Sequence, residues 1–241
     1  MDQCCTVVDL RQYALHHGRR DTLIEVFDEH FVEGQEEAGM HIVGQFRDLD
    51  DADAFVWIRG FRSLRARADA LSAFYYGPIW REYGPKANET MLDSDNALLL
   101  KPVHLGAGYP SLRTPRPSRG TTGLPGSIVA GAVYHRPSPD DGFVRFFTDN
   151  VLPELTASGA TPVAIFETLV AENNFPALPL RDEFVLAWFA RFDGQAAYDE
   201  HRERLATSAA WQGNVLPELL CRSVQATQEL RLRPTARSQL R

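Results

Sequence analysis

An arginine and a tyrosine, Arg11 and Tyr13, stand two positions apart in an apolar segment near the N-terminus. If that segment is a strand, both side chains point to the same face, together with Asp9. A guanidinium in an apolar interior would hold an anionic ligand, such as an enolate or a carboxylate, through paired hydrogen bonds. The tyrosine hydroxyl could donate a hydrogen bond to oxygen charge that develops during a reaction. In the alternative, Arg11 pairs with Asp9 and only satisfies a buried carboxylate.

The same spacing recurs in the next two strand-like segments. His41 shares a face with Gln45 in one of them, and Trp57 shares a face with Arg59 in the other. His41 could act as a general base because the usual pKa of histidine lies near neutrality, or it could simply close the end of its strand. We predict Arg11, Tyr13 and His41 as catalytic residues. The predicted substrate-binding residues are Gln45, Trp57, Arg59, Tyr134, Glu167 and Trp188.

Several other chemistries have no motif behind them. The sequence contains no GxGxxG after a strand, no P-loop, no GxSxG and no HExxH. His16, His17 and His30 are poor metal ligands as a set, because the adjacent pair ends a strand and cannot aim both rings at one ion. The three cysteines include no CxxC pair. We therefore expect neither a metal nor a tightly bound cofactor. The expected partner is a small molecule, with an anionic one and a neutral one as the alternatives.

The composition excludes some classes of partner. The net charge of −7 disfavours nonspecific nucleic-acid binding, which needs a cationic surface. Hydrophobic residues make up 44% of the 241, yet no apolar run is long enough to cross a bilayer. The first residues also lack the pattern of a secretory signal. We expect a soluble, cytoplasmic protein with no membrane partner.

The residues above must be positioned by a β-α-β-β-α-β unit. Strand-like residues 6–15 precede a helical pattern that ends at Gly39, and the hairpin 40–47 and 55–61 follows. Residues 63–88 are helical with a break at Gly77-Pro78, and residues 96–102 form the last strand. This order is typical of a ferredoxin-like α+β unit, in which two helices cover one face of an antiparallel sheet.

The second half of the chain repeats the first. Phe27 corresponds to Phe147 at an offset of 120 residues, whereas Trp57 corresponds to Trp188 at an offset of 131. The growth of the offset predicts an insertion of 11 residues in the second hairpin, near residues 172–182. We predict domains at residues 1–105 and 127–235, a Pro/Gly-rich linker at 106–126, and a solvated tail at 236–241.

Two such units can hide their open sheet faces against each other. We expect the aromatic residues Trp57 and Trp188 on those faces, where water would otherwise reach them. We therefore predict an intramolecular α/β barrel that encloses a pocket, with the site residues inside it. The chain would be a monomer with an internal pseudo-dimer, or a weak homodimer.

Residues 8–15, 39–46, 55–61 and 91–100 together resemble the NIPSNAP family of the dimeric α/β barrel superfamily. The second half resembles it less, since Ala132 stands where the first half has Arg11. The resemblance implies this fold and a pocket, and the wider superfamily includes cofactor-independent oxygenases, cyclases and isomerases. It favours a small-molecule enzyme acting on an enolisable or aromatic metabolite. The alternative is a noncatalytic ligand-binding or scaffold protein that recruits a partner through its helical exterior.

Overall fold

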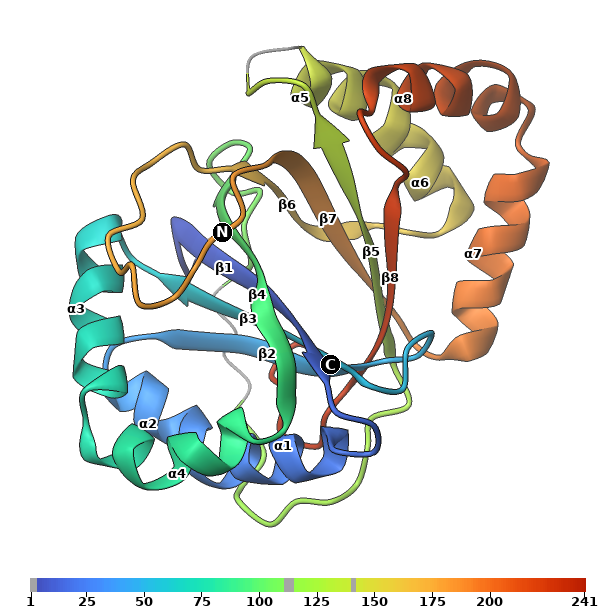
Figure 1. The fold of residues 1–241 in the computed structure, drawn as a ribbon. Coiled ribbons are helices and arrows are strands. Elements are labelled where there is room, and N and C mark those ends of the chain that lie inside the picture. Colours follow the sequence, from blue (N-terminus) through green and yellow to red (C-terminus); the bar gives the residue numbers. More distant parts are fainter. Residues whose placement is uncertain (1–3, 111–114, 140–141) are drawn as a thin grey trace.

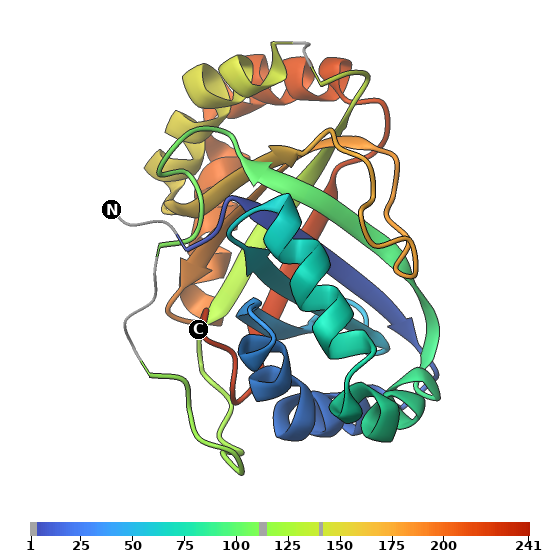
Figure 2. The same ribbon diagram turned by 90° about the vertical axis from the view of Figure 1, so that its left-hand side faces the viewer.

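The computed structural model describes residues 4–110, 115–139 and 142–241. Two helical layers lie at opposite corners of the molecule with all the strands between them (Figure 1). The same layers are seen from the side in Figure 2. None of the helices in the described part of the chain is long and apolar enough to cross a membrane.

The first repeat has the predicted order of elements. Its strands and helices are β1 (Val7–Leu15), α1 (Arg20–Val26), the π-helical turn η1 (Phe27–Phe31), α2 (Val32–Glu37), β2 (His41–Asp48), β3 (Ala54–Phe61), α3 (Leu64–Tyr75), α4 (Pro78–Asn88) and β4 (Met91–Pro102). The Ser63 hydroxyl accepts a hydrogen bond from the amide of Ala66 and begins α3. Pro78 occupies the first turn of α4, where its missing amide hydrogen is not needed.

The second repeat has the same order. Its elements are β5 (Ile128–Arg136), α5 (Phe143–Phe146), η2 (Phe147–Val151), α6 (Leu152–Ser158), β6 (Pro162–Thr168), β7 (Phe184–Phe192), α7 (Gln195–Thr207), η3 (Trp211–Val215), α8 (Leu216–Arg222) and β8 (Gln228–Pro234). The expected start of its first helix at residue 141 lies outside the described residues, and the described helix begins at Phe143.

All eight strands form one closed barrel in the order β1-β3-β2-β8-β5-β7-β6-β4. Two antiparallel seams join the repeats, β2 with β8 and β4 with β6. The prediction of two ferredoxin-like repeats that close into an α/β barrel is therefore confirmed. Closure leaves neither sheet with an unpaired edge.

The inside of the barrel is a packed core rather than the predicted pocket. Aliphatic residues of both repeats meet there, among them Val8, Leu10, Ile58, Val185 and Leu232. Tyr109 comes from the linker between the repeats, called the connector below, and fills part of the same core. Its ring centroid lies 5.2 Å from that of Phe166 and 6.2 Å from that of Phe189. The expectation that the site residues line the barrel interior is thus wrong.

The two tryptophans lie on the helix-covered faces of their sheets, whereas the prediction places them on the faces that turn toward the barrel interior. Trp57 packs under the helices of the first repeat, and Trp188 packs under those of the second. Both are buried, at 1% and 5% exposure, so the prediction that they need cover holds while the cover itself differs. Each sheet is apolar on both faces, and alternation alone does not tell which face turns toward the barrel axis.

The C-terminal segment also differs from expectation. Residues 236–241 were predicted as a solvated tail, but Arg237, Ser238 and Leu240 are buried. The amide of Leu240 donates to the carbonyl of Val43 at 2.9 Å, and Leu240 joins the barrel core. Arg237 forms an ion pair with Glu33. The segment thus closes one end of the barrel because its apolar and charged groups find partners on the first repeat.

Candidate functional site

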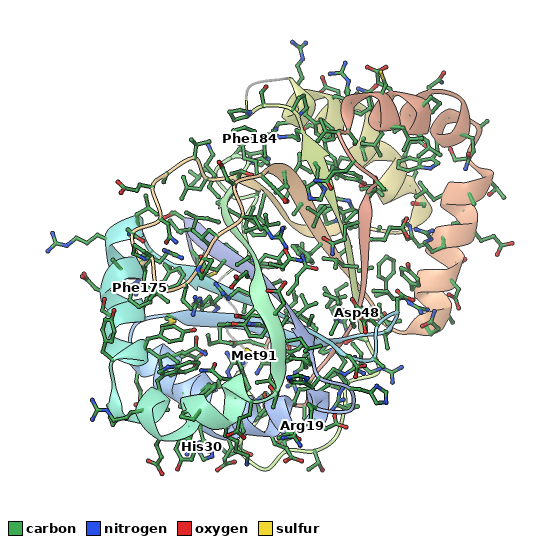
Figure 3. All side chains as sticks on the ribbon, viewed as in Figure 1. Arg19, His30, Asp48, Met91, Phe175 and Phe184 are labelled. Carbon is green, nitrogen blue, oxygen red and sulfur yellow. The ribbon has the colours of Figure 1, made fainter. Side chains whose placement is uncertain are left out.

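A small enclosed cavity lies between the sheet and the helices of the first repeat. Its volume is about 20 Å³, room for one water-sized molecule. Seven aromatic side chains line it, together with three others: Tyr13, Phe27, Phe31, Trp57, Phe74, Tyr75 and Trp80, with Leu23, Gln35 and Met91. Met91, at the start of β4, is labelled above the helical layer in Figure 3.

Behind this cavity lies a buried ionic cluster built on Asp9. The carboxylate accepts from Arg59 Nε and from Arg67 Nε, each at 3.0 Å, and it forms ion pairs with both guanidinium groups. All three side chains are fully buried. Burial alone would raise the pKa of Asp9, but the guanidinium groups of Arg59, Arg67 and Arg11 lower it below the usual value. Asp9 therefore stays ionised and holds the arginines in place.

Arg11 lies beside this cluster and was predicted to be catalytic. Its Nε donates to Tyr13 Oη at 3.1 Å and its Nη2 donates to the carbonyl of Ser94 at 3.0 Å. Its Nη1 is buried without a hydrogen-bond partner. Burial would lower the pKa of Arg11, yet Tyr13, Tyr75 and Asp9 raise it above its usual range, so the side chain is a permanent cation.

The hydroxyl of Tyr13 is arranged as a hydrogen-bond donor. Because its oxygen accepts from Arg11, its own proton is available to another group. Burial raises the pKa of Tyr13, while the Arg11 cation lowers it by less, so the phenol keeps its proton at neutral pH. Tyr75, which also lines the cavity, accepts from Arg59 Nη1 at 3.4 Å in the same manner.

The indole of Trp57 supplies another donor and a surface for a cation. Its Nε1 is buried and unpartnered. The Arg59 guanidinium lies 4.8 Å from the centroid of the Trp57 ring, within the range of a cation–π interaction. Arg59 also donates to Gln35 Oε1 at 3.3 Å. The lining of the cavity therefore includes the donor groups of Tyr13, Gln35, Trp57 and Tyr75, which a ligand with acceptor atoms could satisfy, and Arg59 lies behind it.

Four of the predicted site residues are brought together here, namely Arg11, Tyr13, Trp57 and Arg59. The structure adds Gln35, Arg67 and Tyr75, which the sequence reasoning missed. A signal for Arg67 was available, because it stands at helical spacing with the buried Ala70, Leu71 and Phe74. An arginine on the apolar face of a helix needs a buried carboxylate, which Asp9 provides.

The other predicted residues of the first repeat lie elsewhere. His41 lines a separate surface pocket with Cys4, Glu36 and Arg62. Burial lowers the pKa of His41, which favours the neutral ring. Gln45 Nε2 donates to Asp28 Oδ1, on η1, at 3.0 Å. His41 and Gln45 are therefore not part of the cavity.

Glu167 was predicted to bind substrate from the second repeat. It pairs instead with Arg136 and Lys101, each at 3.3 Å. Lys101 and Glu167 are directly opposite each other across the seam between β4 and β6. Glu167 therefore links the two repeats through its ion pair with Lys101.

The second repeat keeps the aromatic residues of the site but not its charges. Ala132 lies opposite Trp188 where Arg11 lies opposite Trp57, and two alanines lie opposite each other where Asp9 lies opposite Arg59. Trp188 Nε1 donates to Tyr134 Oη at 3.1 Å, so the predicted pair Tyr134 and Trp188 satisfies itself. Within the described residues, the charges of the site are therefore found in the first repeat and not at the equivalent positions of the second.

Metal ligands do not gather in the described part of the chain. There, no three His, Cys, Asp or Glu side chains lie close enough to hold an ion. The residues that could hold a ligand are the hydrogen-bond donors and the aromatic rings of the cavity.

The family of the first repeat follows from comparison with known proteins. The NIPSNAP family model matches residues 8–105. This part of the chain is similar to a NIPSNAP domain, and residues 8–105 are called the NIPSNAP domain from here on. The match coincides with β1 to β4, so it contains Asp9, Arg11, Tyr13, Trp57 and Arg59, whereas the second repeat lies outside it. No curated protein matches the sequence.

Solved structures share the fold of the whole chain. A protein of Fusobacterium nucleatum provisionally named a monooxygenase superposes with a TM-score of 0.58 and 8% identity, over 96% of this chain and 94% of that one. A similarly named protein of Lactobacillus acidophilus gives 0.53 and 12%, over 95% and 93%. A protein named anthrone oxidase-like gives 0.55 and 12%, over 95% and 91%. At these identities the similarity shows the fold alone.

Proposed function

We propose that the NIPSNAP domain binds a planar aromatic molecule through an acceptor or anionic oxygen. The observation that carries this proposal is a cavity lined by seven aromatic side chains, with the unpartnered donor Trp57 Nε1 among them. A second unpartnered donor, Arg11 Nη1, lies behind the lining on a guanidinium that donates to Tyr13. Burying a donor without a partner is unfavourable by about 1–3 kcal/mol. A ligand oxygen that accepts from these groups would recover that free energy, and the rings would stack on its aromatic body.

We further propose that the protein is an enzyme that oxidises an enolisable substrate without a tightly bound cofactor. The enolisable substrate would lose its proton to water or hydroxide from solvent, and Arg11 and the Tyr13 hydroxyl would stabilise the enolate oxygen that results. The enolate carbon would then react with molecular oxygen, so that a methylene group and O2 yield a carbonyl group and water. The names of the structural neighbours support this reaction class, and cyclase or isomerase chemistry would use the same enolate.

A noncatalytic ligand-binding protein is the second candidate. It is favoured by the small volume of the cavity and by a lining that offers hydrogen-bond donors but no carboxylate. The buried carboxylate of Asp9, behind the lining, is occupied by two arginines and is not free to act as a base. In that reading the ligand would be held and released unchanged. A scaffold role through the helical exterior is the remaining alternative.

Binding is tested with 2-naphthoate, an anionic aromatic probe, and tryptophan fluorescence is the signal that reports it. The Arg11→Gln variant should weaken 2-naphthoate binding about tenfold or more, because a charge-assisted hydrogen bond is lost. Binding of neutral naphthalene should change little. Equal loss of both probes would mean that the substitution only disturbs packing, and unchanged binding of both would contradict the assignment of Arg11.

Turnover is tested with anthrone in air-saturated buffer. The enzyme reading predicts consumption of one O2 for each anthraquinone formed, and a slower reaction with Arg11→Gln. Saturable binding of anthrone without oxygen uptake above the buffer rate would favour the noncatalytic candidate.

A further inference from the structure

The segment between β6 and β7, residues 169–183, is the longest difference between the two repeats. Its counterpart between β2 and β3 consists of residues 49–53 only. The longer segment matches the insertion expected from the repeat offsets. It does not stay on its own repeat but runs across to α3 of the NIPSNAP domain (Figures 1 and 2).

Backbone hydrogen bonds anchor both ends of the segment to β4. The amide of Leu169 donates to the carbonyl of Leu99 at 2.9 Å, and the amide of Arg181 donates to the carbonyl of Ala97 at 2.8 Å. Between these two points the segment has no helix or strand of its own. It is therefore tied down at its base, while the part that crosses to α3 depends on side-chain contacts.

Asn174 makes the shorter polar contacts of the crossing part, and Asn173 Oδ1 accepts from Arg67 Nη1 as well, at 3.4 Å. Asn174 Oδ1 accepts from Arg67 Nη1 at 2.8 Å, and Asn174 Nδ2 donates to the carbonyl of Leu64 at 2.6 Å. Arg67 is the same residue that donates to Asp9 at 3.0 Å, and Asp9 binds Arg59. The segment from the second repeat is thus connected through Arg67 to the ionic cluster behind the cavity.

Phe175 makes the apolar contact. It is 5% exposed, and its ring centroid lies 5.8 Å from that of Tyr75 and 5.9 Å from that of Tyr76. Tyr75 lines the cavity. Leu178 and Leu180 of the segment pack against the same core. In Figure 3, Phe175 lies beside α3, far along the chain from the elements that it covers.

We propose that residues 169–183 are the cap of the NIPSNAP site and that Phe175 determines the size of the ligand. This inference rests on the proposed function for the kind of ligand. A cavity of about 20 Å³ cannot admit an aromatic molecule unless a lining side chain moves. Tyr75 is the lining side chain against which Phe175 of the cap packs. The helices and the sheet are held by their own backbone hydrogen bonds. The crossing part of the cap has no helix or strand and is held to the NIPSNAP domain by side-chain contacts, so we expect it to open more readily than they do. The second repeat, which lacks the charged residues of the site, thus supplies the segment that covers the site of the first repeat.

The test compares two aromatic anions of different length, 2-naphthoate and anthracene-2-carboxylate. Phe175→Ala should shift the preference toward the longer anion about tenfold, since Tyr75 can then move into the space that the Phe175 ring leaves and lengthen the pocket. Val170→Ala is the matched control, because Val170 belongs to the same segment but is 65% exposed. Phe175→Leu, which keeps the core filled, should shift the preference in the same direction by less and covers the case in which Phe175→Ala does not fold.

Opening of the cap is measured separately by acrylamide quenching of tryptophan fluorescence. Trp57 and Trp80 line the cavity, so Asn174→Ala and Phe175→Ala should increase quenching, whereas Val170→Ala should not. If neither aromatic anion binds to any variant, the proposed function fails, and this quenching still decides on the cap. Equal quenching in all variants, or equal preference between the anions in Phe175 and Val170 variants, would overturn the cap.

Discussion

Asp9 is the residue on which the charged part of the site depends. It is fully buried and accepts hydrogen bonds from two buried arginines. Asp9→Asn should lower the free energy of unfolding by about 3–5 kcal/mol, because it leaves buried cations without their counter-charge. Asp50→Asn is the matched control, since Asp50 pairs with Arg231 at the surface, and it should change stability by less than about 1 kcal/mol. Urea unfolding measures both, and similar effects would contradict the burial of the cluster.

The pKa of Asp9 sets the pH range in which this stabilisation operates. Its folded-state pKa lies below its unfolded-state value of about 3.9, so folding is favoured fully above that value. The contribution is lost as the pH falls from there through the folded-state pKa. The difference in unfolding free energy between wild type and Asp9→Asn should therefore be constant near neutrality and shrink below about pH 4. A difference that shrinks between pH 8 and pH 5 would be inconsistent with this assignment.

Equivalent tyrosines of the two repeats separate binding from packing. Tyr13→Phe should weaken 2-naphthoate binding severalfold, because it removes a donor from the cavity. Tyr134→Phe removes only an acceptor for Trp188 and should lower stability by about 1 kcal/mol without affecting binding. Titrations followed by tryptophan fluorescence report the first effect and urea unfolding the second. If both variants lost binding equally, the site would not be confined to the first repeat.

At the residue scale the sequence predicted which side chains share a face but not where that face points. The period of two correctly grouped Arg11 with Tyr13 and Trp57 with Arg59. The wrong step was to place them in the barrel. Both faces of these strands are buried, one by the other sheet and one by helices, so burial does not distinguish them. Gln35 and Tyr75 come from helices, and a strand pattern could not bring them to the site.

At the scale of elements, close approach of β5 and β7 requires a glycine at position 131. A Cβ there would lie 2.2 Å from the carbonyl oxygen of Trp188, which is backbone and cannot turn aside. Gly131→Ala should therefore destabilise the protein by about 1–3 kcal/mol, as an overpacked core does. Gly123→Ala, where no atom lies within 4 Å, should be close to neutral. Thermal unfolding of the two variants would show whether the strands can separate without loss.

The order of the elements could be predicted from the sequence, since each helix and strand has its own periodic pattern and breaks at glycine or proline. The insertion in the second hairpin was also visible as a change in the repeat offset. Its destination was not. Asn174 and Phe175 reach α3 because of Arg67 and Tyr75, more than 90 residues earlier in the chain, and no local pattern specifies such a contact.

At the scale of the whole molecule, the two repeats depend on each other through the barrel core and the two seams. A protease site inserted in the connector between Gly123 and Leu124 tests this dependence. After cleavage the halves should stay together in size-exclusion chromatography, because separation would expose the apolar interior of the barrel. Elution of two separate fragments under native conditions would show that the connector, and not the shared core, holds the repeats together.

The central claim is that the ligand site lies under the helices of the NIPSNAP domain and not inside the barrel. The most direct measurement is a crystal structure of the protein with 2-naphthoate. We predict the naphthalene ring among Tyr13, Trp57 and Tyr75, with the carboxylate within hydrogen-bond distance of Arg11 Nη1 and Phe175 displaced. Density for the probe among the aliphatic residues of the barrel core, or beside Trp188 of the second repeat, would contradict the account.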